Sequence, residues 1–301
     1  MENYTIRERN CKAVVFPNRP VWHLFTNGKT SQSFLNSVDN YRFAMNLLAR
    51  CAFEVPENEI LAFALMSNHV HIIISGQKKD IEESFNLFKR RLHRYLCLCG
   101  HPFDRIEMTM KIIESETSLR NNIIYVHRNG YVVNPEHTPF SYPWSTGRYY
   151  FNDIPLEKRV SDLSVLEKRE VFKTRQANIP SDWMMIDGYV APPSFCNIAL
   201  GKAAFKNAHQ YFTMLGKSVE SYSELACDID DEEFLTDSEL FTQISRIVRS
   251  RYNLQSFRDL SKAQKFDIAK VMRFTYRSSN GQIRRLTGLS QYEVDAIFPG
   301  Q

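Results

Sequence analysis

Two histidines one residue apart, His69 and His71, are the side chains in this chain best placed to do chemistry. They lie in a run from Ile60 to Ile74 whose apolar and β-branched residues predict buried strand. Because side chains alternate along a strand, the two imidazoles share one face, while Val70 and Ile72 point the other way. Neighbouring imidazoles on a rigid strand can supply two ligands to a metal ion, or they can be structural histidines satisfied by hydrogen bonds in the core.

A second group of polar side chains lies on a helix further along the chain. The helix is predicted by apolar residues at helical spacing, namely Leu119, Ile123 and Val126. Asn122, Tyr125 and Asn129 share a neighbouring face of that helix, one above the other. Taken alone, such a tyrosine and amide are ordinary helix-surface chemistry.

Together, the histidine pair and the helical tyrosine resemble the single-tyrosine HUH transposases, a family that includes the REP-associated tyrosine transposases. In that family a His-hydrophobic-His strand binds a divalent metal, and a helical tyrosine attacks single-stranded DNA. The resemblance implies that Tyr125 is the nucleophile and that His69, His71 and Asn129 are the metal ligands, the amide lying four residues after the tyrosine. Where family members often have proline after that asparagine, this chain has Gly130, which we expect to end the helix as a left-handed cap.

The resemblance covers roughly residues 15–150, and the order of the predicted elements agrees with it. Periodicity predicts a strand at 21–26, a helix at 38–52, two strands within 60–74, a helix at 81–95, a strand at 106–112 and the tyrosine helix. This βαββαβα order predicts an α+β, ferredoxin-like HUH nuclease core, an antiparallel sheet with helices on one face. After the tyrosine helix, Tyr142-Pro143-Trp144-Ser145 is similar to a segment that the family carries there.

The chemistry of the family accounts for these residue types. A phosphodiester resists attack because it is negatively charged, so a catalyst must neutralise developing charge and align the nucleophile. A divalent ion, Mg²⁺ or Mn²⁺, held by imidazole and amide ligands can polarise a non-bridging oxygen. Attack by Tyr125 would leave a 5′-phosphotyrosine and a free 3′-hydroxyl, and the retained bond energy would permit the strand transfer of DNA transposition and recombination. The chain has no phosphate-binding glycine loop, so no nucleotide cofactor is expected.

Composition is compatible with this chemistry. The chain has 301 residues, 43% of them hydrophobic, and a formal net charge of +4 with a pI near 8.6. Its first residues lack an apolar core and no run is long enough to span a bilayer, so we expect neither a signal peptide nor membrane association. The six scattered cysteines favour a reducing compartment, and the cytoplasm is therefore the expected location.

The distribution of charge predicts four segments. Between Glu220 and Glu239 there are nine acidic residues and no lysine or arginine, whereas from Phe241 to the end eleven basic residues face four acidic ones. We therefore expect an HUH single-strand DNA nuclease domain at 1–150 and a helical connector of unassigned function at 151–219. An acidic linker at 220–239 and a basic helical DNA-binding unit at 240–301 would follow.

The basic unit also carries a helix-turn-helix pattern. Residues 279–287 predict a short helix, Gly288 a turn, and Ser290 with Glu293 a capping box before a last helix ending at Phe298. We expect contacts with phosphate or bases from Arg284, Arg285, Gln291 and Tyr292. A helical bundle with a basic, solvated face is the alternative. Basic residues of the 81–95 helix are expected beside the site, where they could hold a hairpin or a single strand: Lys89, Arg90, Arg91 and Arg94. The alternative is a solvated face opposite the apolar residues of that helix.

Two interpretations remain open. The first is an enzyme that cleaves and rejoins single-stranded or hairpin DNA; the second is a non-catalytic DNA-binding protein of the same fold that regulates or marks repetitive elements. A rival zinc site is also conceivable from four side chains, although Cys-x-Cys is not a usual zinc spacing and Cys97 is expected in a helix core: His93, Cys97, Cys99 and His101. Homodimer formation and the DNA sequence recognised are left open.

Overall fold

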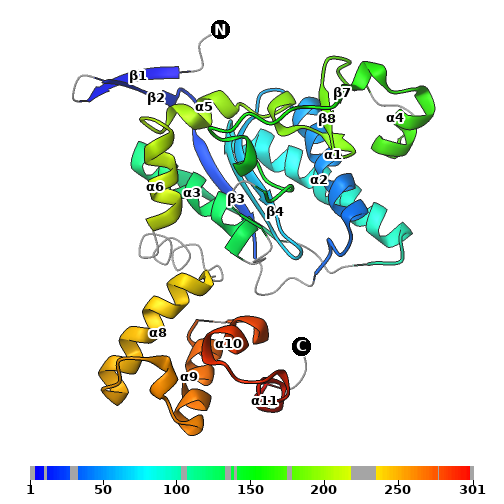
Figure 1. Cartoon of the computed structure of the whole chain (residues 1–301). Coiled ribbons are helices and arrows are strands. Elements are labelled where there is room, and N and C mark those ends of the chain that lie inside the picture. The colour runs from blue at the N-terminus through cyan, green and yellow to red at the C-terminus, as the bar shows by residue number, and fades with distance from the viewer. Residues whose placement is uncertain are drawn as a thin grey trace. The chain divides into compact units, whose positions relative to one another are not determined.

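The computed structural model describes residues 4–9, 12–27, 33–102, 107–132, 137–138, 141–174, 178–217, 235–276 and 278–298. The chain divides into two compact units, Met1–Ser218 and Val219–Gln301. Figure 1 shows the first unit as a sheet flanked by helices and the second as a set of helices. Each unit is described here by itself.

The centre of the first unit is a four-stranded antiparallel sheet. Its order is β4-β5-β3-β6, with strands β3 (Val21–Thr26), β4 (Glu59–Leu65), β5 (Val70–Ser75) and β6 (Met108–Ile113). The intervening helices are α1 (Val38–Glu54), α2 (Lys78–Leu98) and α3 (Glu116–Val132). The chain therefore runs βαββαβα through this core, which confirms the α+β, ferredoxin-like architecture predicted from sequence.

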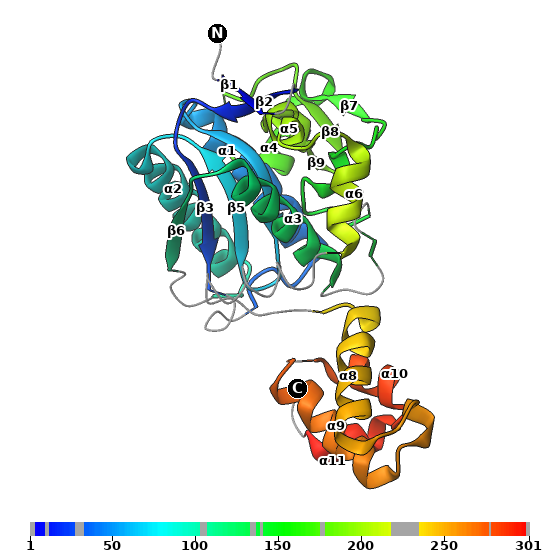
Figure 2. The same ribbon diagram turned by 90° about the vertical axis from the view of Figure 1, so that its left-hand side faces the viewer.

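Helices cover both faces of this sheet. Helices α1 and α2 pack together on one face, and α3 lies on the other, in contact with β4 and β5 (Figures 1 and 2). The expectation of helices on one face only was wrong. The physical reason is that every residue of the central strand β5 is buried, so both faces of the sheet need cover there.

Local sequence explains where the core helices begin and which side they bury. Helix α1 starts after Ser37, whose hydroxyl accepts a hydrogen bond from the backbone N–H of Asn40, and it ends before Pro56. Helix α2 buries the apolar stripe of Ile81, Phe85, Phe88, Leu92 and Leu96.

Smaller elements complete the first unit. A hairpin of β1 (Tyr4–Arg9) and β2 (Lys12–Pro17) precedes the core and was not predicted. Residues 151–217 contain α4 (Val165–Phe172), α5 (Ile198–Ala203), α6 (Ala208–Lys217) and a three-stranded sheet of β7 (Lys158–Arg159), β8 (Met184–Ile186) and β9 (Tyr189–Val190). The stretch expected to be a helical connector therefore also contains strands, and α6 packs against α3.

The second unit is helical. It consists of α8 (Asp237–Tyr252), α9 (Lys262–Phe274), α10 (Asn280–Thr287) and α11 (Gln291–Ile297) around an apolar core that includes Ile244, Ile268 and Ile283. The predicted helix, turn and helix are confirmed, since Gly288 takes a left-handed φ of 69° and Ser290 and Glu293 form the capping box. Residues 220–234 of the expected acidic linker lie outside the described residues. Its last residues, 237–239, form the first turn of α8, which is capped by Thr236.

Throughout the described part of the chain, no helix combines the length and the apolar character needed to cross a membrane.

Candidate functional site

The two histidines sit where the β4–β5 hairpin turns into its second strand. The backbone N–H of Met66 donates to the carbonyl of His69 over 2.9 Å, which closes the turn at Ser67 and Asn68. Strand β5 begins at Val70, so His71 lies in the strand and His69 just before it. Both imidazoles are buried, and their ring centroids are 4.9 Å apart with the planes nearly perpendicular. The turn and the strand thus bring the predicted pair together.

A third histidine, His23 on β3, belongs to the same cluster. Its Nε2 lies 3.1 Å from Nδ1 of His71, a hydrogen bond in the core. Because β3 pairs with β5 in the register Phe25↔His71, His23 emerges on the same sheet face one pair further along. The sequence analysis did not select this residue. A strand histidine on the predicted first strand was the available signal, but the register that aligns it with His71 is a long-range property.

Tyr125 of α3 covers these histidines. Its ring centroid lies 5.4 Å from that of His71, with planes at 82°, and 5.9 Å from that of His23. The aromatic ring of Phe25 extends the cluster, at 5.2 Å from His23. The structure therefore unites the predicted nucleophile with the predicted histidine pair, and Tyr125 is buried with only 1% of its surface exposed.

The two asparagines of α3 differ in orientation. Asn129 follows Tyr125 by one helical turn and is buried, on the stretch of α3 that faces the sheet. Asn122 turns back along its own helix, and its amide donates to the carbonyl of Ser118 over 2.8 Å. Of the amides that share the tyrosine's face, Asn122 is therefore engaged with its own helix, and Asn129 is the candidate for the site.

The hydrogen bonds of the two histidines indicate which ring nitrogen could bind a metal ion. Nδ1 of His69 lies 2.7 Å from Oδ1 of Asn68, and Nδ1 of His71 lies 3.1 Å from Nε2 of His23, so Nε2 of each ring is the nitrogen that could act as a ligand. Such an orienting partner on the second ring nitrogen is usual for metal-binding histidines. Among the residues that the structure describes, no group of three or more His, Cys, Asp or Glu side chains is arranged to hold a metal. A site here would therefore need an amide ligand such as Asn129.

Helix α3 is fixed in place by buried polar contacts on its other sides. His127 places Nδ1 2.9 Å from the hydroxyl of Tyr211 on α6 and Nε2 2.9 Å from the hydroxyl of Thr146. Burial lowers the pKa of His127 to about 3, so the ring is neutral. Arg128 is fully buried and donates to the carbonyl of Leu215, also on α6. These contacts hold the helix that carries Tyr125, and the sequence analysis missed them.

The segment after the tyrosine helix extends the sheet edge. The carbonyl of Trp144 accepts from the backbone N–H of Leu65 over 2.9 Å, and the N–H of Thr146 donates to the carbonyl of Phe63 over 3.0 Å, both on β4. The hydroxyl of Tyr142 donates to the carbonyl of Leu65 over 2.6 Å. The Tyr-Pro-Trp-Ser segment thus bonds to the edge strand β4, and its Tyr142 ring lies against α3.

Gly130 has a different role from the one expected. Helix α3 continues to Val132, and Gly130 is not among the described glycines with a positive φ, so the predicted left-handed cap was wrong. A Cβ at Gly130 would overlap the ring of Tyr142, 2.6 Å from its Cγ. Glycine is needed here because the Tyr142 ring lies directly against the helix backbone.

The basic residues of α2 do not lie beside the histidines. Lys89, Arg90 and Arg94 belong to the helix layer across the sheet from α3 (Figure 2), so that expectation was wrong. The cause is the ferredoxin-like crossover, which puts α2 beside α1. The rival zinc motif begins on the same helix with His93 and Cys97 and continues past its end at Leu98, and Cys97 is exposed and not in a helix core as expected.

The candidate contacts of the second unit are on its surface. Arg284 donates to the side chain of Gln291 over 3.0 Å, and Tyr292 is 84% exposed. Arg285 makes a two-pronged contact with Asp237 of α8, at 2.6 and 3.0 Å, which ties α10 to α8. This pair raises the pKa of Arg285, so the guanidinium is charged but already partnered.

Comparisons with known proteins add a distant likeness in fold. No family model matches the chain, and no curated protein matches its sequence. Among solved structures, the chain is similar to one of a REP-associated tyrosine transposase bound to a REP hairpin, with 16% sequence identity and a TM-score of 0.37. The match covers 52% of this chain and 96% of that one. The function is therefore argued from the site.

Proposed function

We propose that this protein is a tyrosine endonuclease and strand transferase of the HUH transposase type, acting on single-stranded or hairpin DNA. The observation that carries the proposal is that the ring centroid of His71 lies 5.4 Å from that of Tyr125 and 4.9 Å from that of His69. The phenol of Tyr125 has a high intrinsic pKa and needs activation, and two potential metal ligands lie beside it. This combination suits metal-assisted cleavage of a phosphodiester.

The metal ligands in this proposal are His69, His71 and Asn129. Because Nδ1 of each histidine faces a neighbouring side chain, both rings are held with Nε2 toward the ligand position. A bound Mg²⁺ or Mn²⁺ would polarise a non-bridging phosphate oxygen. His23 would act as a positioning residue, because ligation through Nε2 of His71 puts the proton of that ring on Nδ1, where Nε2 of His23 would accept it.

The reaction balances without an external energy source. The phenolic oxygen of Tyr125 forms a bond to phosphorus, and the bond from phosphorus to the 3′ oxygen breaks. The phenol releases one proton and the departing 3′ oxygen takes up one, so the products are a 5′-phosphotyrosine and a free 3′-hydroxyl. Attack by another 3′-hydroxyl reverses these steps on a new partner, which is strand transfer.

A non-catalytic DNA-binding protein of the same fold is the second candidate. It is favoured by one observation, the burial of Tyr125, a residue of α3 with only 1% of its surface exposed. For the enzyme, DNA must reach this hydroxyl, so the side chains that cover it have to move when substrate binds. For a binding protein, the same cluster would be a polar core satisfied by its own contacts.

The experiment that separates the two candidates is cleavage of single-stranded hairpin libraries in Mg²⁺ or Mn²⁺. We expect His69→Ala and His71→Ala each to abolish cleavage, and the double variant to be no worse, because ligands that act as a unit are not additive. His93→Ala is the control, since this exposed histidine lies on α2 across the sheet. Full cleavage by either site variant would show that the histidines are structural. No metal-dependent cleavage by the unaltered protein on any hairpin would favour the binding protein.

A further inference from the structure

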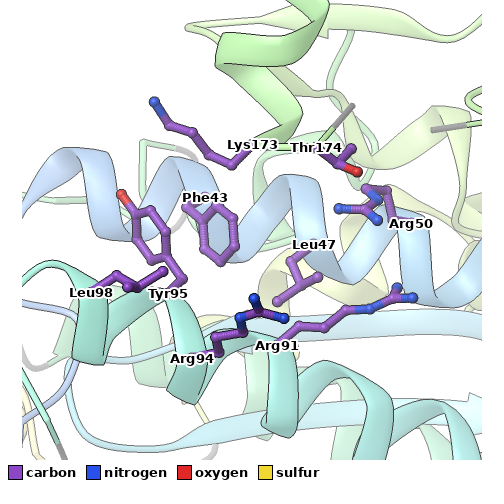
Figure 3. Close-up of a pocket in the computed structure, with 9 residues that line it drawn as sticks. All are labelled: Phe43, Leu47, Arg50, Arg91, Arg94, Tyr95, Leu98, Lys173 and Thr174. Atoms are coloured by element: carbon purple, nitrogen blue, oxygen red, sulfur yellow. The ribbon is translucent and has the colours of Figure 1, made fainter. Parts of the chain in front are cut away.

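A cavity of about 440 Å³ opens in the helix layer on the far side of the sheet from Tyr125. Figure 3 shows its walls, which come from α1, α2 and the residues that follow α4. Its lining consists of Phe43, Leu47, Arg50, Arg91, Arg94, Tyr95, Leu98, Lys173 and Thr174. The volume is in the range of small-molecule binding sites.

The cavity has an excess of positive charge. Its lining includes three arginines and a lysine but no acidic residue. Glu54 lies nearby and is shared, at 2.8 Å from Arg91 and 3.9 Å from Arg50. Neither Arg94 nor Lys173 has an ion-pair partner in the part of the chain that the structure describes. Asp39 acts on Tyr95 at the other end of the cavity. Two neighbouring carboxylates thus stand against four cations, and the surplus favours an anionic ligand.

Burial sharpens this preference at Arg50. Its side chain is 12% exposed, and desolvation together with the charge of Arg91 lowers its pKa. Arg50 and Arg91 are neighbouring, partly buried cations, so a bound anion stabilises them more than it would stabilise arginines on the surface. Guanidinium groups match the oxygens of a phosphate in geometry, which makes phosphate the anion of choice.

An aromatic pair forms one end of the cavity. Phe43 and Tyr95 stack with centroids 3.7 Å apart and planes at 16°, and Leu98 beside them is 80% exposed. Burial and a hydrogen bond with Cys99 raise the pKa of Tyr95 to about 12, so its phenol is a neutral donor at physiological pH. An aromatic face and an exposed apolar side chain next to a phosphate site suit a planar base.

We propose that this cavity binds a nucleotide, its phosphate held by Arg50, Arg91 and Arg94 with Lys173 at the rim, and its base against Tyr95 and Leu98. The nucleotide is either a free mononucleotide or a unit of single-stranded DNA, because both present the same phosphate and base. The cavity is separated from the histidine cluster by the sheet. The inference therefore does not depend on the proposed nuclease activity.

The test is calorimetric titration of the full-length protein with deoxyadenosine 5′-monophosphate, inorganic phosphate and deoxyadenosine. The Tyr125→Phe protein is used throughout, so that DNA cleavage does not enter the result. We expect the monophosphate to bind more tightly than phosphate, and deoxyadenosine to bind least. Arg94→Ala should weaken the monophosphate tenfold or more, since a charge-assisted hydrogen bond is removed, and Lys173→Ala should weaken it less.

The matched control is Arg90→Ala, which removes an exposed arginine from the same helix but outside the cavity. It should leave monophosphate affinity within twofold. The proposal is overturned if the monophosphate does not bind at millimolar concentration, or if Arg94→Ala and Lys173→Ala leave its affinity unchanged. Equal affinity for phosphate and the monophosphate would also overturn it, because the base would then contribute nothing.

A 5′-phosphorylated tetradeoxyadenylate distinguishes the two sources. Binding at least tenfold tighter than the monophosphate, with the same loss in Arg94→Ala, identifies single-stranded DNA as the ligand. Equal affinity of the two, again dependent on Arg94, identifies a free nucleotide. Tetranucleotide binding that Arg94→Ala does not change would place the strand elsewhere and contradict the proposal.

Discussion

Replacing Gly130 by alanine should destabilise the first unit although alanine is the better helix former. The new Cβ would overlap the Tyr142 ring at Cδ1 and lie 2.6 Å from Cγ and 2.8 Å from Cε1. That ring is held by the hydrogen bond from its hydroxyl to the carbonyl of Leu65, so it cannot move away freely. Overpacking costs about 1–3 kcal/mol, and straining this hydrogen bond adds about 1 kcal/mol.

Alanine offsets part of this loss. Its helix propensity returns about 1 kcal/mol relative to glycine, so the expected net loss in the free energy of unfolding is about 1–3 kcal/mol. Gly216→Ala is the matched control, because Gly216 lies in α6 and a Cβ there meets nothing within 4 Å. It should stabilise the protein by up to about 1 kcal/mol.

Urea denaturation followed by tryptophan fluorescence measures both changes. All three tryptophans, Trp22, Trp144 and Trp183, lie in the first unit, so the signal does not report unfolding of the second. A stability of Gly130→Ala equal to or above that of the unaltered protein, with the control stabilised as expected, would refute the packing of Tyr142 on α3.

Three further outcomes are expected. His23→Ala should weaken Mg²⁺ or Mn²⁺ binding about 10–100-fold by calorimetry, because the orienting partner of a metal ligand is removed; unchanged affinity would exclude His23 from the site. Cys51, whose pKa burial raises to about 12, should resist iodoacetamide at pH 8 while the exposed Cys97 and Cys99 react, as mass spectrometry would show; equal rates would contradict its burial. Removal of 219–301 should weaken DNA binding, while cleavage at saturating protein persists. The salt dependence of binding should flatten by roughly one unit of slope for each phosphate that the shortened protein no longer neutralises. An unchanged slope would make the second unit a structural bundle.

Local patterns in the sequence were sufficient to predict the core elements and one cap. The β5 run, the Ser67-Asn68 turn and the Ser290–Glu293 capping box depend on residues close in the chain, and each is found where it was predicted. Element order then fixed the ferredoxin-like topology, because crossovers between neighbouring strands leave few alternatives. The histidine pair and Tyr125 were predicted to meet, and they do.

The contacts that the sequence did not predict are long-range. His23 meets His71 only through the β3–β5 register, and His127 finds Tyr211 on a helix that the chain reaches much later. Helix periodicity puts His127 on the same face as Leu119 and Ile123, but it does not show that α6 covers this face and supplies the hydrogen-bond partner. The function of Gly130 likewise depends on Tyr142, which is positioned by the hydrogen bonds of Trp144 and Thr146 with β4.

The most direct measurement of the central claim is covalent capture of DNA. The protein is incubated with a labelled single-stranded hairpin substrate in Mg²⁺ or Mn²⁺, denatured, separated on a gel, and the adduct is mapped by mass spectrometry of its peptides. The account predicts a denaturant-resistant adduct on the peptide containing Tyr125, abolished by Tyr125→Phe and retained by Tyr292→Phe, which alters a tyrosine that is 84% exposed. An adduct that survives Tyr125→Phe, or that maps to another tyrosine, would contradict it.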